Sequence, residues 1–156
     1  MSARFPAVLL ASAAFSLYAV AGEIPSLSGA WTLNVEKSRW GNKPKPKSVV
    51  VHIEHNEPAL KYQGTVVDAT GESRDFSLEG MIDGKPYPIV ADYGEGLVTI
   101  RRLNDTTIRS EFRTHDGRYV ETARTSISSD GRTLTRRIRL RGPDGSRSWT
   151  EVYEKH

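Results

Sequence analysis

Residues 116–154 read DGRYVETARTSISSDGRTLTRRIRLRGPDGSRSWTEVYE, and this stretch decides the fold class. It contains the pairs Asp116-Gly117, Asp130-Gly131 and Asp144-Gly145, which recur every 14 residues. Asp-Gly favours tight hairpin turns, because glycine tolerates a positive φ and aspartate hydrogen-bonds its own backbone. Apolar and polar residues alternate between the pairs, as in strands with one buried face. The stretch therefore predicts an antiparallel meander.

The same alternation extends toward the N-terminus, where a fourth pair, Asp83-Gly84, marks another turn. No stretch shows the periodicity of a long helix. Each proline of the segment from Lys43 to Lys47 lacks an amide donor, so the segment cannot pair as a central strand and we expect a loop over one mouth of the fold. The nine expected strands cover residues 30–35, 49–53, 60–66, 76–78, 97–103, 108–112, 119–128, 133–141 and 147–154.

Nine sequential antiparallel strands either close into a barrel or split into two packed sheets. Closure removes exposed strand edges, so the sequence predicts an all-β, antiparallel up-and-down β-barrel, with a two-sheet β-sandwich as the alternative. The alternation also predicts the core. Its expected members are Trp31, Leu33, Val51, Ile53, Leu60, Tyr62, Phe76, Leu78, Val98, Ile100, Ile108, Phe112, Leu134, Ile138 and Tyr153.

The first 21 residues have the features of a secretory signal peptide. Arg4 provides a positive n-region, residues 5–20 carry no charge, and Ala19-Val20-Ala21 places small residues where a signal peptidase reads them. We expect cleavage before Gly22, leaving residues 22–156 as a single barrel domain in the periplasm or the medium. The net charge then falls from +3 to +2, because Arg4 is the only charged residue lost.

Composition excludes several chemistries and predicts no cofactor. The chain has no cysteine, which rules out disulfides, thiolate nucleophiles and cysteine-based zinc sites. His52 and His55 are three residues apart on a strand, so they point to opposite faces and predict no metal pair. Asp68, Asp92 and Glu95 lie near turns, where acids usually form the turn, so no catalytic residue is assigned. The modest positive charge predicts no nucleic-acid partner.

The segment Leu27-Ser28-Gly29-Ala30-Trp31-Thr32-Leu33-Asn34 resembles the first-strand Gly-x-Trp motif of the lipocalins and the wider calycin group. With Glu36-Lys37-Ser38 and the final Val152-Tyr153-Glu154-Lys155, the pattern is similar to small exported bacterial proteins described as lipocalin-like. The resemblance implies a barrel closed at one end by Trp31 beneath a late-strand arginine. Ala91-Asp92-Tyr93 matches the mid-chain Thr-Asp-Tyr motif of lipocalins only in part.

A buried charge pair is expected inside the barrel. Arg136 is in phase with Leu134 and Ile138, and a guanidinium on a buried face needs an acid or an anionic ligand. Glu151, on the face of Trp149 and Tyr153, is the natural partner. The pair is either a structural plug or a carboxylate-binding pocket. The candidate ligand-binding residues are Trp31, Tyr62, Arg136, Trp149, Glu151 and Tyr153.

Three hypotheses for function follow, and the third, an enzyme on the same barrel, would require two or more convergent polar groups inside a cavity. The first is an exported binding module that holds an apolar or amphipathic small molecule in the barrel. The second is a structural or interaction protein of the cell envelope with a filled barrel and no ligand. A run of basic residues is either an anion-binding face or a solvated outer face. Its members are Arg132, Arg136, Arg137, Arg139, Arg141 and Arg147.

Overall fold

The computed structural model describes residues 23–156, so the predicted signal peptide and its cleavage site lie outside the described residues. Every strand pairing in it is antiparallel. The ten strands are β1 (Gly29–Leu33), β2 (Ser48–Asn56), β3 (Ala59–Val67), β4 (Ser73–Met81), β5 (Pro86–Ala91), β6 (Gly94–Asn104), β7 (Thr107–Thr114), β8 (Val120–Ile127), β9 (Thr133–Gly142) and β10 (Gly145–Lys155). Residues 23–156 include no helix with the length and apolar character needed to cross a membrane.

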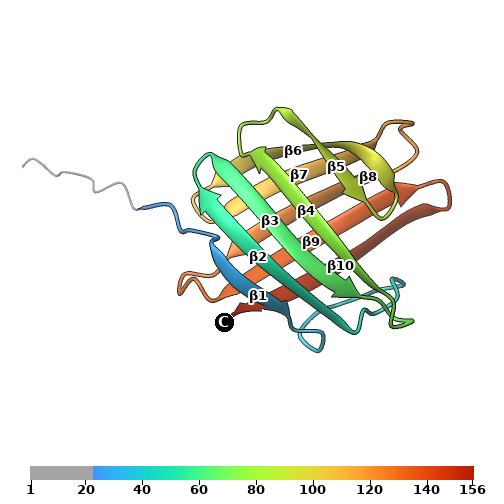
Figure 1. Ribbon diagram of the computed structural model, residues 1–156, viewed down its shortest axis with the longest axis horizontal. Helices are drawn as coiled ribbons and strands as arrows, with labels where there is room; N and C mark the ends of the chain where they lie inside the picture. The colour runs from blue at the N-terminus through green and yellow to red at the C-terminus, as the bar shows by residue number, and fades with distance from the viewer. Residues whose placement is uncertain (1–22) are drawn as a thin grey trace, which may run out of the picture.

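The strands form one sheet in the order β4-β3-β2-β1-β10-β9-β8-β7-β6-β5. Sequence neighbours pair throughout, and β1 pairs with β10, so the sheet wraps around until β4 and β5 face each other without a ladder between them. Figure 1 shows β2, β3 and β4 crossing in front of the strands that follow β5. The predicted up-and-down barrel is confirmed, in a form that stays open along one seam.

The strand count predicted from the sequence was wrong by one, because β5 was missed. Pro86 and Pro88 lie in this strand and lack the backbone N–H that a central strand needs. β5 is an edge strand that pairs only with β6, so its free side needs no donors. Prolines at such an edge also hinder pairing with another chain.

Three of the four Asp-Gly pairs lie in connections between consecutive strands, and the fourth, Asp144-Gly145, ends the β9–β10 connection, with Gly145 as the first residue of β10. Gly117 and Gly131 adopt φ values of 70° and 68°, in the left-handed region that favours glycine. Asp116 Oδ1 accepts a hydrogen bond from the backbone N–H of Arg118 at 3.0 Å, and Asp130 Oδ1 accepts one from Arg132 at 3.0 Å. The predicted turn chemistry is therefore present.

The predicted core is buried except at Ile53, Tyr62 and Phe76, which are half-buried. Trp31 has no accessible surface, and its indole N–H donates to the Leu27 carbonyl at 2.9 Å. The cation above its ring is the ammonium of Lys155, 5.2 Å from the ring centroid, where the resemblance implied an arginine. Trp31 therefore closes one end of the core.

Candidate functional site

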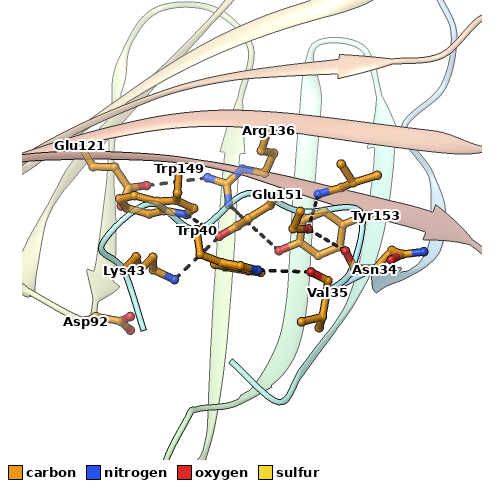
Figure 2. Close-up of polar contacts among 12 residues, drawn as sticks. Asn34, Val35, Trp40, Lys43, Asp92, Glu121, Arg136, Trp149, Glu151 and Tyr153 are labelled. Carbon is orange, nitrogen blue, oxygen red and sulfur yellow. Dashed lines mark hydrogen bonds and ion pairs between the residues drawn. The ribbon is translucent and has the colours of Figure 1, made fainter. Parts of the chain in front are cut away.

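A group of polar side chains lies inside the barrel on the last two strands. Strand phase directs Arg136 of β9 inward between Leu134 and Ile138, and the β9–β10 register places Glu151 directly opposite Arg136. Trp149 and Tyr153 flank Glu151 on the same face of β10. Figure 2 shows these side chains converging on the Glu151 carboxylate.

Glu151 is buried, and both of its carboxylate oxygens accept hydrogen bonds. Its Oε1 accepts the Trp149 indole N–H at 2.8 Å, and its Oε2 accepts the Tyr153 hydroxyl at 2.9 Å and Arg136 Nη1 at 3.3 Å. The pairing of Arg136 with Glu151 that the sequence predicts is thus observed. Among residues 23–156, no buried side-chain nitrogen or oxygen lacks a hydrogen-bond partner. A buried polar cluster in which every group is hydrogen-bonded is rigid.

A second carboxylate, which sequence analysis missed, faces Arg136 from β8. Glu121 Oε1 lies 3.7 Å from Arg136 Nη2. Burial raises the pKa of Glu121, while the positive charge of Arg136 opposes the rise. The signal was available, since Glu121 alternates in phase with the buried Ala123 and Ile127. Arg136 is therefore held between two acids.

The loop between β1 and β2 sends one side chain into this cluster. The Lys43 ammonium lies 4.9 Å from the Trp149 ring centroid and 5.3 Å from that of Trp40, and 4.0 Å from Glu151 Oε1. Figure 2 shows Lys43 approaching Glu151 from the side opposite Arg136. Burial lowers the pKa of Lys43, and the Glu151 charge opposes this. Residues 34–47, here called the strap, are held to the barrel by Lys43, by the backbone bridge between Arg39 and Thr150, and by Ser38 Oγ, which accepts the Val152 N–H at 3.0 Å.

Several inward side chains in the middle of the barrel keep accessible area. Arg136 and Glu121 point inward, yet their side chains remain 34% and 22% accessible. Ser110 and Thr125 also face inward by strand phase and are only half-buried. An inward side chain that keeps accessible area must lie beside space that no other side chain fills. We call this space the lumen.

A hollow of about 980 Å³ lies over the seam between β4 and β5. Its lining consists mostly of outward side chains of β2 to β5, and it reaches Phe76 and Ile89 at the seam. At one end the Tyr87 ring packs on Gly80, where an added Cβ would meet its Cγ at 3.0 Å. At the other end Arg74 Nη2 forms an ion pair with Asp92 Oδ2 at 2.6 Å. The seam is thus bridged at both ends by side chains.

The structure brings together four of the six predicted site residues, Arg136, Trp149, Glu151 and Tyr153. Tyr62 projects from β3 toward the same space, and the charges of Arg136 and Glu121 both act on its phenol, whose pKa is raised mainly by burial. Trp31 does not join them. A side chain without accessible surface does not line the lumen, so Trp31 is a core residue.

Three of the other titratable groups singled out in the sequence, Asp68, Asp92 and His55, have structural partners. Asp68 Oδ1 accepts turn hydrogen bonds from the backbone N–H groups of Thr70, Gly71 and Glu72. His52 is exposed on the outer face, whereas His55 faces inward with Nε2 2.6 Å from Glu57. The described part of the chain contains no group of three or more histidine, cysteine or acidic side chains arranged to hold a metal ion.

Comparison with known proteins identifies the fold. The chain superposes on an extracellular fatty acid binding protein, As-p18, with a TM-score of 0.59 and 12% identity, over 86% of this chain and 100% of the other. The fatty acid binding protein of Schistosoma mansoni, in complex with arachidonic acid, gives 0.56 and 11%, over 86% and 99% of the two chains.

A zebrafish ileal bile acid-binding protein complexed with cholic acid gives a TM-score of 0.54 and 16% identity, over 84% of this chain and 100% of the other. No model of a protein family matches the chain, and no curated protein matches it significantly in sequence. The chain therefore has the calycin-type barrel of the fatty-acid-binding proteins, and this likeness concerns the fold.

Proposed function

We propose that this protein is an exported binding module whose lumen holds one apolar or amphipathic small molecule. The observation that carries the proposal is accessible polar area inside the wall: Arg136 and Glu121 point into the barrel and keep 34% and 22% of their side chains accessible. An unfilled lumen costs packing energy, and a bound molecule recovers it. Export rests on the predicted signal peptide of residues 1–21.

The lining suits a molecule with one polar end. Arg136 and Glu121 offer hydrogen-bond donors and acceptors at one wall, whereas Ile53, Tyr62 and Phe76 offer apolar surface on β2, β3 and β4. Mostly apolar walls with a few placed polar groups are typical of small-molecule sites. The fold neighbours bound to arachidonic acid and cholic acid support an amphipathic ligand.

We expect a ligand to enter the lumen by one of two routes. The first is the seam between β4 and β5, which has no backbone ladder and is bridged at one end by the Arg74–Asp92 ion pair. The second passes the strap, which covers the cluster through Lys43. Exposed ion pairs and single cation–π contacts are each worth only about 1 kcal/mol. The Arg74–Asp92 ion pair and the contacts of Lys43 can therefore break reversibly.

A lumen-filling substitution tests the proposal. Ser110→Phe places a ring in the lumen, and Thr99→Phe, its control, places the same ring on the outer face of the neighbouring strand β6. Dodecanoate, dodecylammonium and dodecyl maltoside are titrated by isothermal calorimetry. We expect saturable binding of at least one of them, weakened about tenfold or more in Ser110→Phe alone. Equal binding by both variants would overturn the proposal, and no binding by the wild type would favour the filled-barrel envelope protein.

A further inference from the structure

A row of arginines crosses the outer face of the barrel. The register places Arg101 of β6 opposite Arg109 of β7, Arg109 opposite Arg124 of β8, and Arg124 opposite Arg137 of β9. All four alternate with inward residues and are exposed. We call these four residues the arginine row.

The row continues across β10 to the strap. Arg137 pairs with Thr150, and Thr150 forms an isolated bridge with Arg39, which is also exposed. Neighbouring strands lie about 4.8 Å apart, so the line from Arg101 to Arg39 spans roughly 24 Å. An extended ligand would meet a positive charge at almost every strand along this line.

Fold stability does not explain the row, because like charges directly opposite each other on a sheet are destabilising. Only one member has an acidic neighbour within ion-pair distance in the described residues: Arg109 Nη2 lies 4.0 Å from Glu111, which also pairs with Arg113 at 3.2 Å. Arg101, Arg124 and Arg137 form no ion pair within residues 23–156. The repulsion is therefore uncompensated.

A hollow of about 700 Å³ lies over the same strands. Its lining includes Arg109, Arg124 and Arg137, together with Arg39 of the strap. Short outward side chains also line it, among them Thr122, Ser148 and Thr150. The surface thus combines guanidinium walls with a floor of hydroxyl groups. Guanidinium forks suit carboxylates, sulfates and phosphates, and hydroxyls suit other hydroxyls.

We infer that the arginine row and this hollow bind a linear polyanion of the acidic polysaccharide class. The hydroxyl floor suits sugar hydroxyls. Trp149 belongs to the lining of the hollow, but its ring is buried and its indole N–H is bonded to Glu151, so it offers no exposed face for stacking nucleic-acid bases. Two large exposed apolar side chains, Leu97 and Leu103, lie on β6 beside Arg101, but β7, β8 and β9, which carry the rest of the row, have none. The centre of the row therefore has no apolar side chain to insert into a bilayer.

A charge-matched pair of double variants tests the inference. Arg124→Thr with Arg137→Thr removes the centre of the row, while Arg118→Thr with Arg132→Thr removes the same charge from two hairpin turns. Heparin is the probe, titrated calorimetrically at about 0.15 M salt, where distant charges are screened. We expect the row variant to lose about tenfold or more in affinity, as two charge-assisted contacts disappear, and the turn variant to bind like the wild type.

The row variant should also melt at the same temperature as the wild type or higher, because the like-charge contacts are relieved. An equal loss in both variants would mean that net charge alone drives binding and would overturn the inference. So would tighter binding of a single-stranded oligonucleotide, or of vesicles rich in anionic lipid, than of heparin. The row variant should keep wild-type affinity for the lumen probes, so this inference and the proposed function fail separately.

Discussion

Arg136 and Glu151, directly opposite each other on β9 and β10, form a hydrogen-bonded ion pair inside the barrel, with Arg136 Nη1 donating to Glu151 Oε2 at 3.3 Å. The carboxylate is buried, whereas about a third of the guanidinium side chain remains accessible to the lumen. Glu151 thus anchors the pair in the barrel wall, and Arg136 exposes part of its side chain to the lumen.

Removal of the Glu151 carboxylate should destabilise the protein. Glu151→Ala leaves Arg136 without its closest partner and orphans the donors of Trp149 and Tyr153. We expect a loss of about 3 kcal/mol, at the low end for a broken buried pair because Arg136 retains access to water. Glu151→Gln keeps an acceptor and should lose about 1 to 2 kcal/mol. Urea unfolding measures both, and a wild-type midpoint for Glu151→Ala would contradict the assignment.

A second prediction concerns Trp31, which closes one end of the core. Trp31 is fully buried and its indole N–H is bonded to Leu27. Trp31→Ala should therefore lower the free energy of unfolding by about 3 to 5 kcal/mol. Trp40 of the strap, which is only half-buried, provides the control, and Trp40→Ala should lose clearly less. Thermal unfolding followed by circular dichroism distinguishes the two, and equal losses would refute this account of Trp31.

Much of this architecture could be predicted from the sequence, because alternation and Asp-Gly turns are local signals. The inward phase of Arg136 and its pairing with Glu151 also follow from alternation. β5 was missed because Pro86 and Pro88 are compatible with a strand only at an edge, and edges are set by tertiary structure. The position of Lys43 depends on the path of its loop, and the alignment of the arginine row depends on the register between strands. Neither can be predicted from a single segment of the sequence.

The strap predicts a kinetic effect. Lys43 contacts two rings and the Glu151 charge, whereas Lys45, in the same loop, is exposed and pairs with Glu36 at 2.8 Å. Lys43→Ala removes about 1 kcal/mol of strap docking, so lumen probes should associate roughly fivefold faster. Lys45→Ala should leave the rate unchanged. Stopped-flow mixing measures both rates, and identical rates in the two variants would show that ligands do not pass the strap.

Acid stability depends on a bidentate pair between the β2–β3 turn and β6. Arg102 donates from Nε and Nη2 to Glu57 at 2.8 and 2.6 Å, which holds the pKa of Glu57 below its ordinary 4.5. A depressed carboxyl pKa stabilises the fold above pH 4.5, and this stability is lost as the pH falls through the folded-state pKa. The pair is partly exposed, so its contribution should stay below about 1 kcal/mol.

Glu57→Gln should therefore reduce stability at neutral pH and converge with the wild type in acid. Glu54→Gln, on exposed surface of β2, is the control and should track the wild type at every pH. Urea midpoints recorded from neutral pH down to about pH 3 give the comparison. A constant difference between Glu57→Gln and the wild type across that range would contradict the role of this pair.

The central claim is that the lumen holds a small molecule beside Arg136. Native mass spectrometry of protein purified from its own source, without refolding, tests this most directly. The account predicts one non-covalent small molecule per chain, released on denaturation and absent from Ser110→Phe purified in parallel. A bare chain mass for the wild type, or the same adduct on Ser110→Phe, would contradict it.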